Sequence, residues 1–123
     1  VMADPVRVDQ ILGHLIQNAI DASAEDEPIF INARRRDLSV AIEVRDQGTG
    51  MSNEFIRSQL FKPFASSKKG GFGIGAYEAR ELARAMKGRL EVESQEGGGS
   101  RFTLILPLAK RLSDGNSADE RAA

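Results

Sequence analysis

The sequence predicts a single α/β domain in which amphipathic helices and alternating strands share one hydrophobic core. Two helical patterns, one opening the chain and one beginning near Ala76, are separated by a pair of strand patterns and followed by a second pair. The length of 123 residues suffices for one core over a sheet and is too short for two domains. We expect the folded domain to span residues 1–109 and the polar residues 110–123 to form a disordered tail.

The composition excludes several classes of protein. A formal net charge of −1 and a single basic run, Arg34 to Arg36, give no footprint for nucleic acid, so we expect no nucleic-acid partner. The absence of cysteine excludes disulfides, thiolate nucleophiles and cysteine-type zinc sites, and it fits a reducing compartment. No apolar run approaches the ~20 residues that a membrane span needs. We therefore expect a cytoplasmic location and no direct membrane contact by this chain, although its parent protein could be membrane-anchored.

Residues 5–23 form the first predicted helix, with Asp4 as its N-cap and Pro5 in its first turn. Its apolar residues recur at helical spacing: Val8, Ile11, Leu12, Leu15, Ile16, Ala19 and Ile20. One flank of that apolar stripe holds His14, Asn18, Asp21 and Ala22. An interior Asn usually just faces solvent, and for Asn18 taken alone this interpretation stays open.

Residues 29–35 and 38–46 alternate as two strands. The core-facing positions of the second strand are Leu38, Val40, Ile42 and Val44. Asp46 is in phase with them, so a carboxylate points to the core side and needs a hydrogen-bonding partner. Asp46 could instead cap the following turn, and Gly48 and Gly50 in that turn would let a flat ligand lie against the backbone.

A short helix over residues 54–61, capped by Ser52 or Asn53, leads into an aromatic pair around Pro63. Residues 65–71 are polar and irregular, a composition typical of a lid over a ligand. The lid runs into a loop with alternating glycines, followed by a helix from Ala76 that we expect Gly88 to cap. Such a loop, with Lys68 and Lys69 upstream, can hold an anion at the helix N-terminus; a plain hinge is the alternative. By its spacing the helix that follows should bury Ala76, Ala79, Leu82, Ala83 and Met86.

The last two strands, residues 89–94 and 101–107, form a hairpin-like pair around the glycine-rich residues 95–100. Their apolar positions alternate: Leu90 and Val92, then Phe102, Leu104 and Leu106. The final strands therefore add a second amphipathic surface to the predicted core.

Four motifs in order resemble the ATP-binding domain of the GHKL superfamily of gyrase, chaperone, histidine kinase and mismatch-repair ATPases. They are an N box at residues 14–22, a first glycine box at 46–51, an F box at 61–64 and a second glycine box at 71–75. Residues 97–107 look like the last glycine box and terminal strand of sensor histidine kinases. The resemblance implies the GHKL, or Bergerat, fold: a two-layer α/β (α+β) sandwich with a mixed, largely antiparallel sheet and helices packed on one face. It also implies strands ahead of the N box, so we expect a fragment.

The resemblance implies that Asp46 accepts a hydrogen bond from the adenine amine, that Gly50 lets the base approach, and that Asn18 is the protein ligand of a magnesium ion. It assigns the remaining ATP contacts to Ala22, Gly48, Met51, Phe61, Lys68, Lys69, Gly71, Phe72, Gly73, Ile74, Gly75 and Ser100. Phe61 could equally serve in packing. The candidate catalytic residues are Asn18 and His14, where His14 orients Asn18 or a metal-bound water, or simply packs.

The sequence departs from the family pattern at two positions. Asp21 stands where many histidine kinases have a phosphate-contacting lysine, a role that Lys68 or Lys69 could take over. His14 stands where hydrolytic members have a general-base Glu, which argues against an ATP hydrolase. A nucleotide-binding adaptor without catalysis is a further alternative, which the intact Asn18 and Asp46 oppose. A dinucleotide enzyme is disfavoured because its glycine fingerprint must directly follow a strand.

The resemblance thus favours the catalytic domain of a bacterial sensor histidine kinase, with ATP and magnesium as cofactors. Its implied reaction transfers the γ-phosphoryl group to a histidine on a separate dimerisation domain, and then to the receiver domain of a response regulator.

Overall fold

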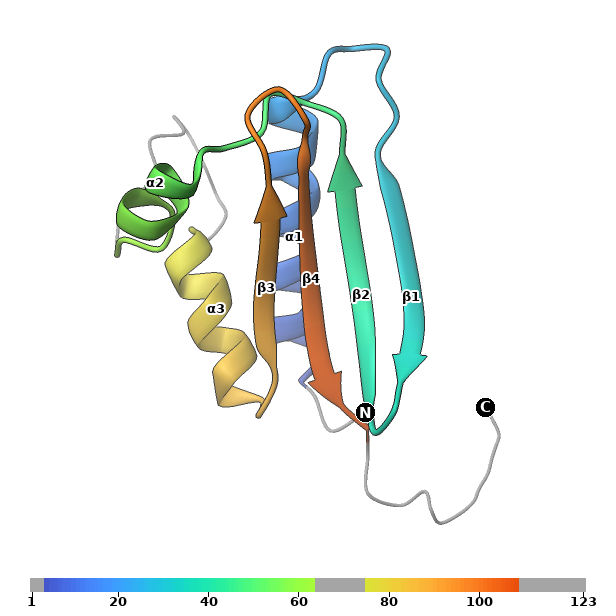
Figure 1. The fold of residues 1–123 in the computed structure, drawn as a ribbon. Coiled ribbons are helices and arrows are strands. Elements are labelled where there is room, and N and C mark those ends of the chain that lie inside the picture. Colours follow the sequence, from blue (N-terminus) through green and yellow to red (C-terminus); the bar gives the residue numbers. More distant parts are fainter. Residues whose placement is uncertain (1–3, 64–74, 109–123) are drawn as a thin grey trace.

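The computed structural model describes residues 4–63 and 75–108. In chain order the elements are α1 (Pro5–Ala22), β1 (Phe30–Arg36), β2 (Ser39–Asp46), α2 (Asn53–Phe55), the π-helical turn η1 (Ile56–Leu60), α3 (Ala76–Ala85), β3 (Arg89–Ser94) and β4 (Ser100–Pro107). The helices pack on one face of the sheet and leave its other face open, as Figure 1 shows. The predicted two-layer α+β sandwich is confirmed.

The four strands form one sheet in the order β1-β2-β4-β3, and each neighbouring pair is antiparallel. The predicted largely antiparallel pairing is therefore confirmed. The expected mixed character is not seen, since the strands in the described ranges contain no parallel pair. Because β4 lies between β2 and β3, the end of β2 comes next to the turn that joins the last two strands.

The core lies between this sheet and the helices. Helix α1 contributes Ile11, Leu15 and Ala19, and the small residues Ala79 and Ala83 let α3 approach closely. The sheet contributes Val44, Leu90, Phe102, Leu104 and Leu106. These positions are among those that the two periodicities predicted, but two predicted core residues are exposed. Ile20 near the end of α1 is 51% exposed, and Leu38 is 77% exposed in the turn between β1 and β2, because the strand pattern extends beyond the strand itself.

The helix ends follow their capping chemistry. Asp4 Oδ1 accepts the Val6 N–H at 2.9 Å, and Ser52 Oγ accepts the Phe55 N–H at 3.1 Å, as the sequence predicts. At the end of α3 the prediction is wrong in detail, since Lys87, with φ of 65°, takes the left-handed position. The Gly88 and Lys87 amides donate to the Ala83 and Arg84 carbonyls in a Schellman motif. Gly88 is needed for another reason: a Cβ there would lie 2.1 Å from the Ile105 carbonyl oxygen.

The predicted domain boundary at residue 109 remains a prediction, because residues 109–123 lie outside the described part of the chain. Within residues 4–63 and 75–108, no helix is long and apolar enough to cross a bilayer.

Truncating a buried leucine should lower the stability of the fold strongly, whereas truncating an exposed leucine should not. Leu104 is fully buried, so Leu104→Ala is expected to lower the free energy of unfolding by about 2–5 kcal/mol. The matched control Leu38→Ala should change it by less than about 0.5 kcal/mol. Urea unfolding followed by circular dichroism measures both, and equal losses would contradict the core assignment.

Candidate functional site

Three segments that are distant in sequence meet at one end of the sheet: the C-terminal end of α1, the turn after β2 and the turn between β3 and β4 (Figure 1). This end collects seven of the predicted site residues: Asn18, Ala22, Asp46, Gly48, Gly50, Met51 and Ser100. Their convergence defines the candidate site.

Asp46 ends β2 as a buried carboxylate, opposite Ser100 of β4 in the strand register. Its Oδ1 accepts the Gly48 N–H at 2.8 Å, so the turn-capping role that the sequence left open is present. Its Oδ2 accepts no hydrogen bond from the residues that the structure describes. Because Oδ2 has no donor in the described chain and is not among its fully buried unsatisfied atoms, it reaches the surface of the site, where it is suited to accept a bond from a ligand.

Glycines allow the three segments to touch through their backbones. A Cβ on Gly48 would lie 2.1 Å from the Ala22 carbonyl oxygen at the end of α1. A Cβ on Gly50, whose φ is +72°, would lie 1.9 Å from the Gln95 carbonyl oxygen in the β3–β4 turn. In return, Gly99 lies against the Asp46 carbonyl, where a Cβ would come within 2.2 Å of the oxygen. A larger residue at any of these positions would push the segments apart.

A small hydrogen-bond network stabilises the same contact. Ser94 Oγ accepts the Met51 N–H at 2.7 Å, and it lies 2.8 Å from Ser100 Oγ and 2.9 Å from the Gly99 carbonyl oxygen. The Gly97 N–H donates to the Thr49 carbonyl at 2.7 Å. The predicted residues Met51 and Ser100 are thus joined through Ser94, which the sequence analysis did not single out because a serine at a strand end has no distinguishing pattern.

His14 and Asn18 are in direct contact on α1, with His14 Nε2 at 3.1 Å from Asn18 Nδ2. An amide nitrogen cannot accept, so in this orientation Asn18 donates to the ring nitrogen of His14. This bond fixes the amide orientation of Asn18 and turns its Oδ1 away from His14. A single oriented amide oxygen fits magnesium, which takes few protein ligands and keeps phosphate and water oxygens.

Asp21, at the position where the resemblance led us to expect a lysine, accepts a hydrogen bond from Gln17 Nε2 at 2.9 Å. The bond joins two exposed side chains one helical turn apart. Residue 21 therefore presents a carboxylate at the rim of the candidate site.

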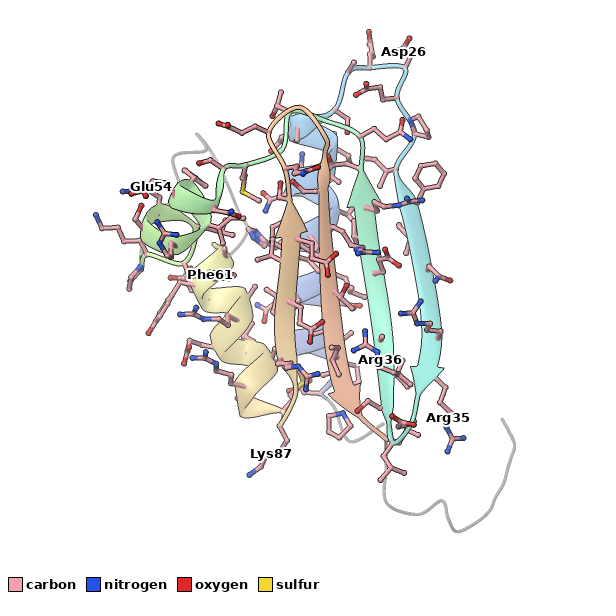
Figure 2. All side chains as sticks on the ribbon, viewed as in Figure 1. Asp26, Arg35, Arg36, Glu54, Phe61 and Lys87 are labelled. Atoms are coloured by element: carbon pink, nitrogen blue, oxygen red, sulfur yellow. The ribbon has the colours of Figure 1, made fainter. Side chains whose placement is uncertain are left out.

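Phe61 packs against the core beside α3, as Figure 2 shows. The guanidinium carbon of Arg80 lies 4.4 Å from the centre of the Phe61 ring and 6.0 Å from that of Tyr77. Arg80 Nε is buried without a hydrogen-bond partner among the described residues, and its contacts are the aromatic rings and an ion pair with Glu81 Oε2 at 4.0 Å. No sequence pattern predicts this pair, because a contact between a loop ring and a helix side chain has no fixed spacing.

Gly75 is the N-cap of α3, and Glu78 Oε1 accepts its N–H at 3.0 Å. The other predicted loop residues, Lys68, Lys69, Gly71, Phe72, Gly73 and Ile74, lie outside the described residues, as does the predicted lid. The described residues contain no cluster of three or more His, Cys, Asp or Glu side chains that could hold a metal ion.

Comparison with known proteins supports a nucleotide site. The family described as histidine kinase-, DNA gyrase B- and HSP90-like ATPases matches residues 3–110. The chain is 35% identical over 112 residues to the C4-dicarboxylate transport sensor protein DctS of Rhodobacter capsulatus, a match that covers 88% of this chain and 17% of that protein. It is also 35% identical over 108 residues to the sensor histidine kinase ZraS of Escherichia coli, a match that covers 88% of this chain and 23% of that protein.

The fold has a solved counterpart in the catalytic domain of the histidine kinase ThkA. The two chains superpose with a TM-score of 0.73 at 30% sequence identity, over 85% of this chain and 68% of that one. The chain therefore spans most of a solved catalytic domain but only 17% and 23% of the two curated sensor proteins above.

Substituting the glycine that touches α1 should loosen the site. Gly48→Ala places a methyl group against the Ala22 carbonyl and is expected to destabilise the fold by about 1–3 kcal/mol. Gly13→Ala is the matched control, because nothing lies within 4 Å of the position that its methyl group would take in the middle of α1. It should stabilise the fold by about 0.5–1 kcal/mol. In thermal unfolding, we expect Gly48→Ala to lower the midpoint temperature and Gly13→Ala to raise it. Stabilisation by both variants would refute the close contact at Gly48.

Proposed function

Because the chain belongs to the histidine kinase-, DNA gyrase B- and HSP90-like ATPases, as an ATP-binding catalytic domain of the sensor histidine kinase type, we propose that it donates the γ-phosphoryl group of Mg-ATP to a histidine on a separate dimerisation domain. The receiver domain of a response regulator would then take the group. The observation that carries the proposal is the buried carboxylate of Asp46, whose Oδ2 has no donor in the described chain.

Asp46 selects adenine in this proposal. Its Oδ1 is held by the Gly48 amide, so Oδ2 keeps one orientation and can accept a hydrogen bond from the exocyclic amine of the base. Guanine has a carbonyl oxygen at the corresponding position, which would leave two acceptors facing each other. Gly50 is also assigned to the base, but the Gln95 carbonyl fills the space of its missing side chain, so only the rest of its backbone would face the base.

Asn18 is the proposed magnesium ligand, with His14 as the residue that orients it. The hydrogen bond between His14 Nε2 and Asn18 Nδ2 directs the amide oxygen away from the ring. A magnesium ion held by the Asn18 amide oxygen would neutralise phosphate charge during transfer. The remaining binding residues, which include Ala22, Met51, Phe61 and Ser100, would line the same site.

The phosphates are assigned to Lys68, Lys69, the amides of Gly71 and Gly73, and the amide of Gly75, which is the N-cap of α3. This assignment is supported by the glycine motif and by the helix N-terminus, which attracts anions. Phosphoryl transfer needs positioning and charge neutralisation more than covalent chemistry from the protein, and lysines and amides supply both.

The phosphoacceptor must come from elsewhere. The sequence has one histidine, His14, and its Nε2 is engaged by Asn18 on the wall of the site. A residue fixed there cannot move in line with the leaving oxygen, as phosphoryl transfer requires. A cytoplasmic location is part of the proposal, because ATP and response regulators are found there.

His14 stands in place of the general-base Glu of hydrolytic members, which supports a kinase over an ATP hydrolase.

Removing the charge of Asp46 should weaken nucleotide binding. Asp46→Asn retains an oxygen for the Gly48 amide but can present a donor to the adenine amine, so affinity for Mg-ATP is expected to fall about tenfold or more. The exposed Asp37→Asn makes the same charge change in the β1–β2 turn, at the other end of β2, and should leave affinity unaltered. Titration of a fluorescent ATP analogue measures both variants. Undiminished binding by Asp46→Asn would remove this residue from the adenine site.

The chain alone should not phosphorylate itself. Incubated with magnesium and γ-labelled ATP, it is expected to stay unlabelled, whereas an added histidine-bearing dimerisation domain should acquire acid-labile label. The variant His14→Gln distinguishes the outcomes, because label on the isolated chain that is lost in this variant would identify His14 as an acceptor and contradict the proposed roles.

A further inference from the structure

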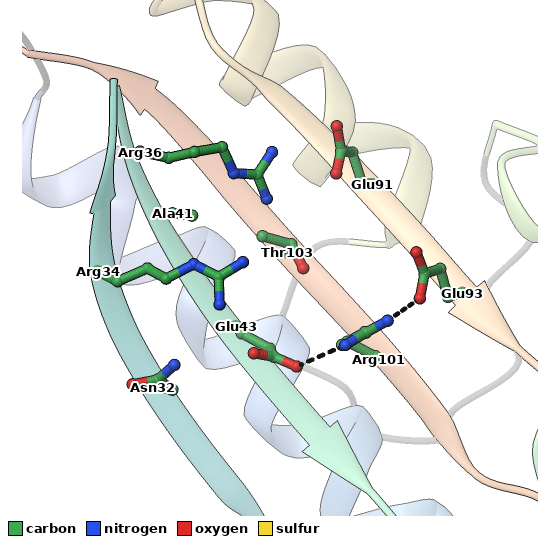
Figure 3. Close-up of a pocket in the computed structure, with 9 residues that line it drawn as sticks. All are labelled: Asn32, Arg34, Arg36, Ala41, Glu43, Glu91, Glu93, Arg101 and Thr103. Carbon is green, nitrogen blue, oxygen red and sulfur yellow. Dashed lines mark hydrogen bonds and ion pairs between the residues drawn. The ribbon is translucent and has the colours of Figure 1, made fainter. Parts of the chain in front are cut away.

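The helix-free face of the sheet carries a shallow hollow that the nucleotide proposal does not use. Its volume is about 130 Å³, and its floor is formed by small residues of the central strands, Ala41 and Thr103. Its walls are long polar and charged side chains from all four strands, drawn in Figure 3: Asn32, Arg34, Arg36, Glu43, Glu91, Glu93 and Arg101.

The carboxylates of this hollow are already engaged. Arg101 lies between Glu93, to which it donates a hydrogen bond, and Glu43, whose Oε2 is 3.4 Å from its Nη1. Hydrogen bonding and charge from Glu93, followed by Glu43, raise the pKa of Arg101 further above its ordinary value. Glu91 pairs with Arg89 at 2.8 Å. Each of the three carboxylates therefore has an arginine partner, although two of them share Arg101, so one net negative charge remains.

Arg34 and Arg36 are different. Every other arginine in the described ranges has an ion pair, a hydrogen bond or an aromatic ring as partner for its side chain, and these two have none. They stand two residues apart on β1, so both side chains lie on the open face, and Figure 3 shows their guanidinium groups reaching over Ala41 and toward Thr103. The hollow thus presents two guanidinium groups that lack a direct partner among the described residues, above a small-residue floor.

We propose that this hollow is a docking site for an acidic side chain on a protein partner, whose carboxylate is held by Arg34 and Arg36. Planar guanidinium groups bind carboxylates with paired, charge-assisted hydrogen bonds. The Thr103 hydroxyl at the floor can donate a further bond. The site lies on the face opposite α1, so a partner can dock there while nucleotide occupies the site that contains Asn18.

The surrounding charges favour a single carboxylate over a polyanion. Glu43, Glu91 and Glu93 line the same hollow and would repel the closely spaced charges of nucleic acid, an anionic membrane or a phosphate dianion. Arg34 is exposed, and no polar side chain of the hollow is buried, so the walls do not form an enclosed ion site. A carboxylate on a protein surface brings neighbouring residues that can cover the hollow and meet its outer glutamates.

The test titrates a short peptide with a single glutamate among serines, while the arginine Nε–H signals are followed by nuclear magnetic resonance. The signals of Arg34 and Arg36 should shift together. Arg34→Gln or Arg36→Gln should each weaken binding about fivefold. Arg35→Gln is the matched control, since it removes the same charge from the residue between them, whose Nε donates to the Asp37 carbonyl. It should change affinity less than about twofold.

Other results would overturn the proposal. Equal weakening by Arg35→Gln would mean general attraction to a basic strand. Binding of a peptide with glutamine in place of glutamate would show that the site does not recognise a carboxylate. Inorganic phosphate or phosphatidylserine vesicles that bind as tightly as the peptide would indicate an ion or membrane site, and no shift with the peptide would mean no site. Mg-ATP affinity should be the same in all these variants, so the outcome is independent of the proposed nucleotide site.

Discussion

The close backbone contact between the turn after β2 and its two neighbours is the constraint on which the site depends. Gly48 lies against the Ala22 carbonyl, and Gly50 against the Gln95 carbonyl, at separations that leave no room for a Cβ. This contact joins the end of α1 to the end of the sheet. It therefore sets where Asn18, one turn before Ala22, stands relative to Asp46, and it converts residues from three segments into one site.

The two faces of the sheet carry different sets of residues. The face covered by α1 and α3 holds the core and, at its end, Asp46 and the His14–Asn18 pair. The open face carries a network of charged side chains in which, among the described residues, only Arg34 and Arg36 are arginines without side-chain partners. Because side chains alternate along β2, the strand can present Val44 to the core and Glu43 to the open face.

The periodic features of the fold were predictable from sequence, because one face of each element is buried. Helix α1 with its Asp4 cap, the phase of Asp46 with Val44 and the small-residue face of α3 all follow from spacing. Leu38 was wrongly assigned because alternation does not mark where a strand turns. Gly88 was misinterpreted because a glycine needed for close approach to Ile105 looks like a left-handed cap. Contacts such as Arg80 over Phe61 join positions with no fixed spacing, so only the structure reveals them.

The central claim is that Asp46 and Asn18 face the base and the metal of one bound Mg-ATP. A crystal structure of the chain with magnesium and a non-hydrolysable ATP analogue tests it most directly. The account predicts the adenine amine within hydrogen-bonding distance, roughly 2.7–3.2 Å, of Asp46 Oδ2, and magnesium coordinated by Asn18 Oδ1. A nucleotide bound elsewhere, for example with its phosphates on Arg34 and Arg36 of the open face, would contradict it.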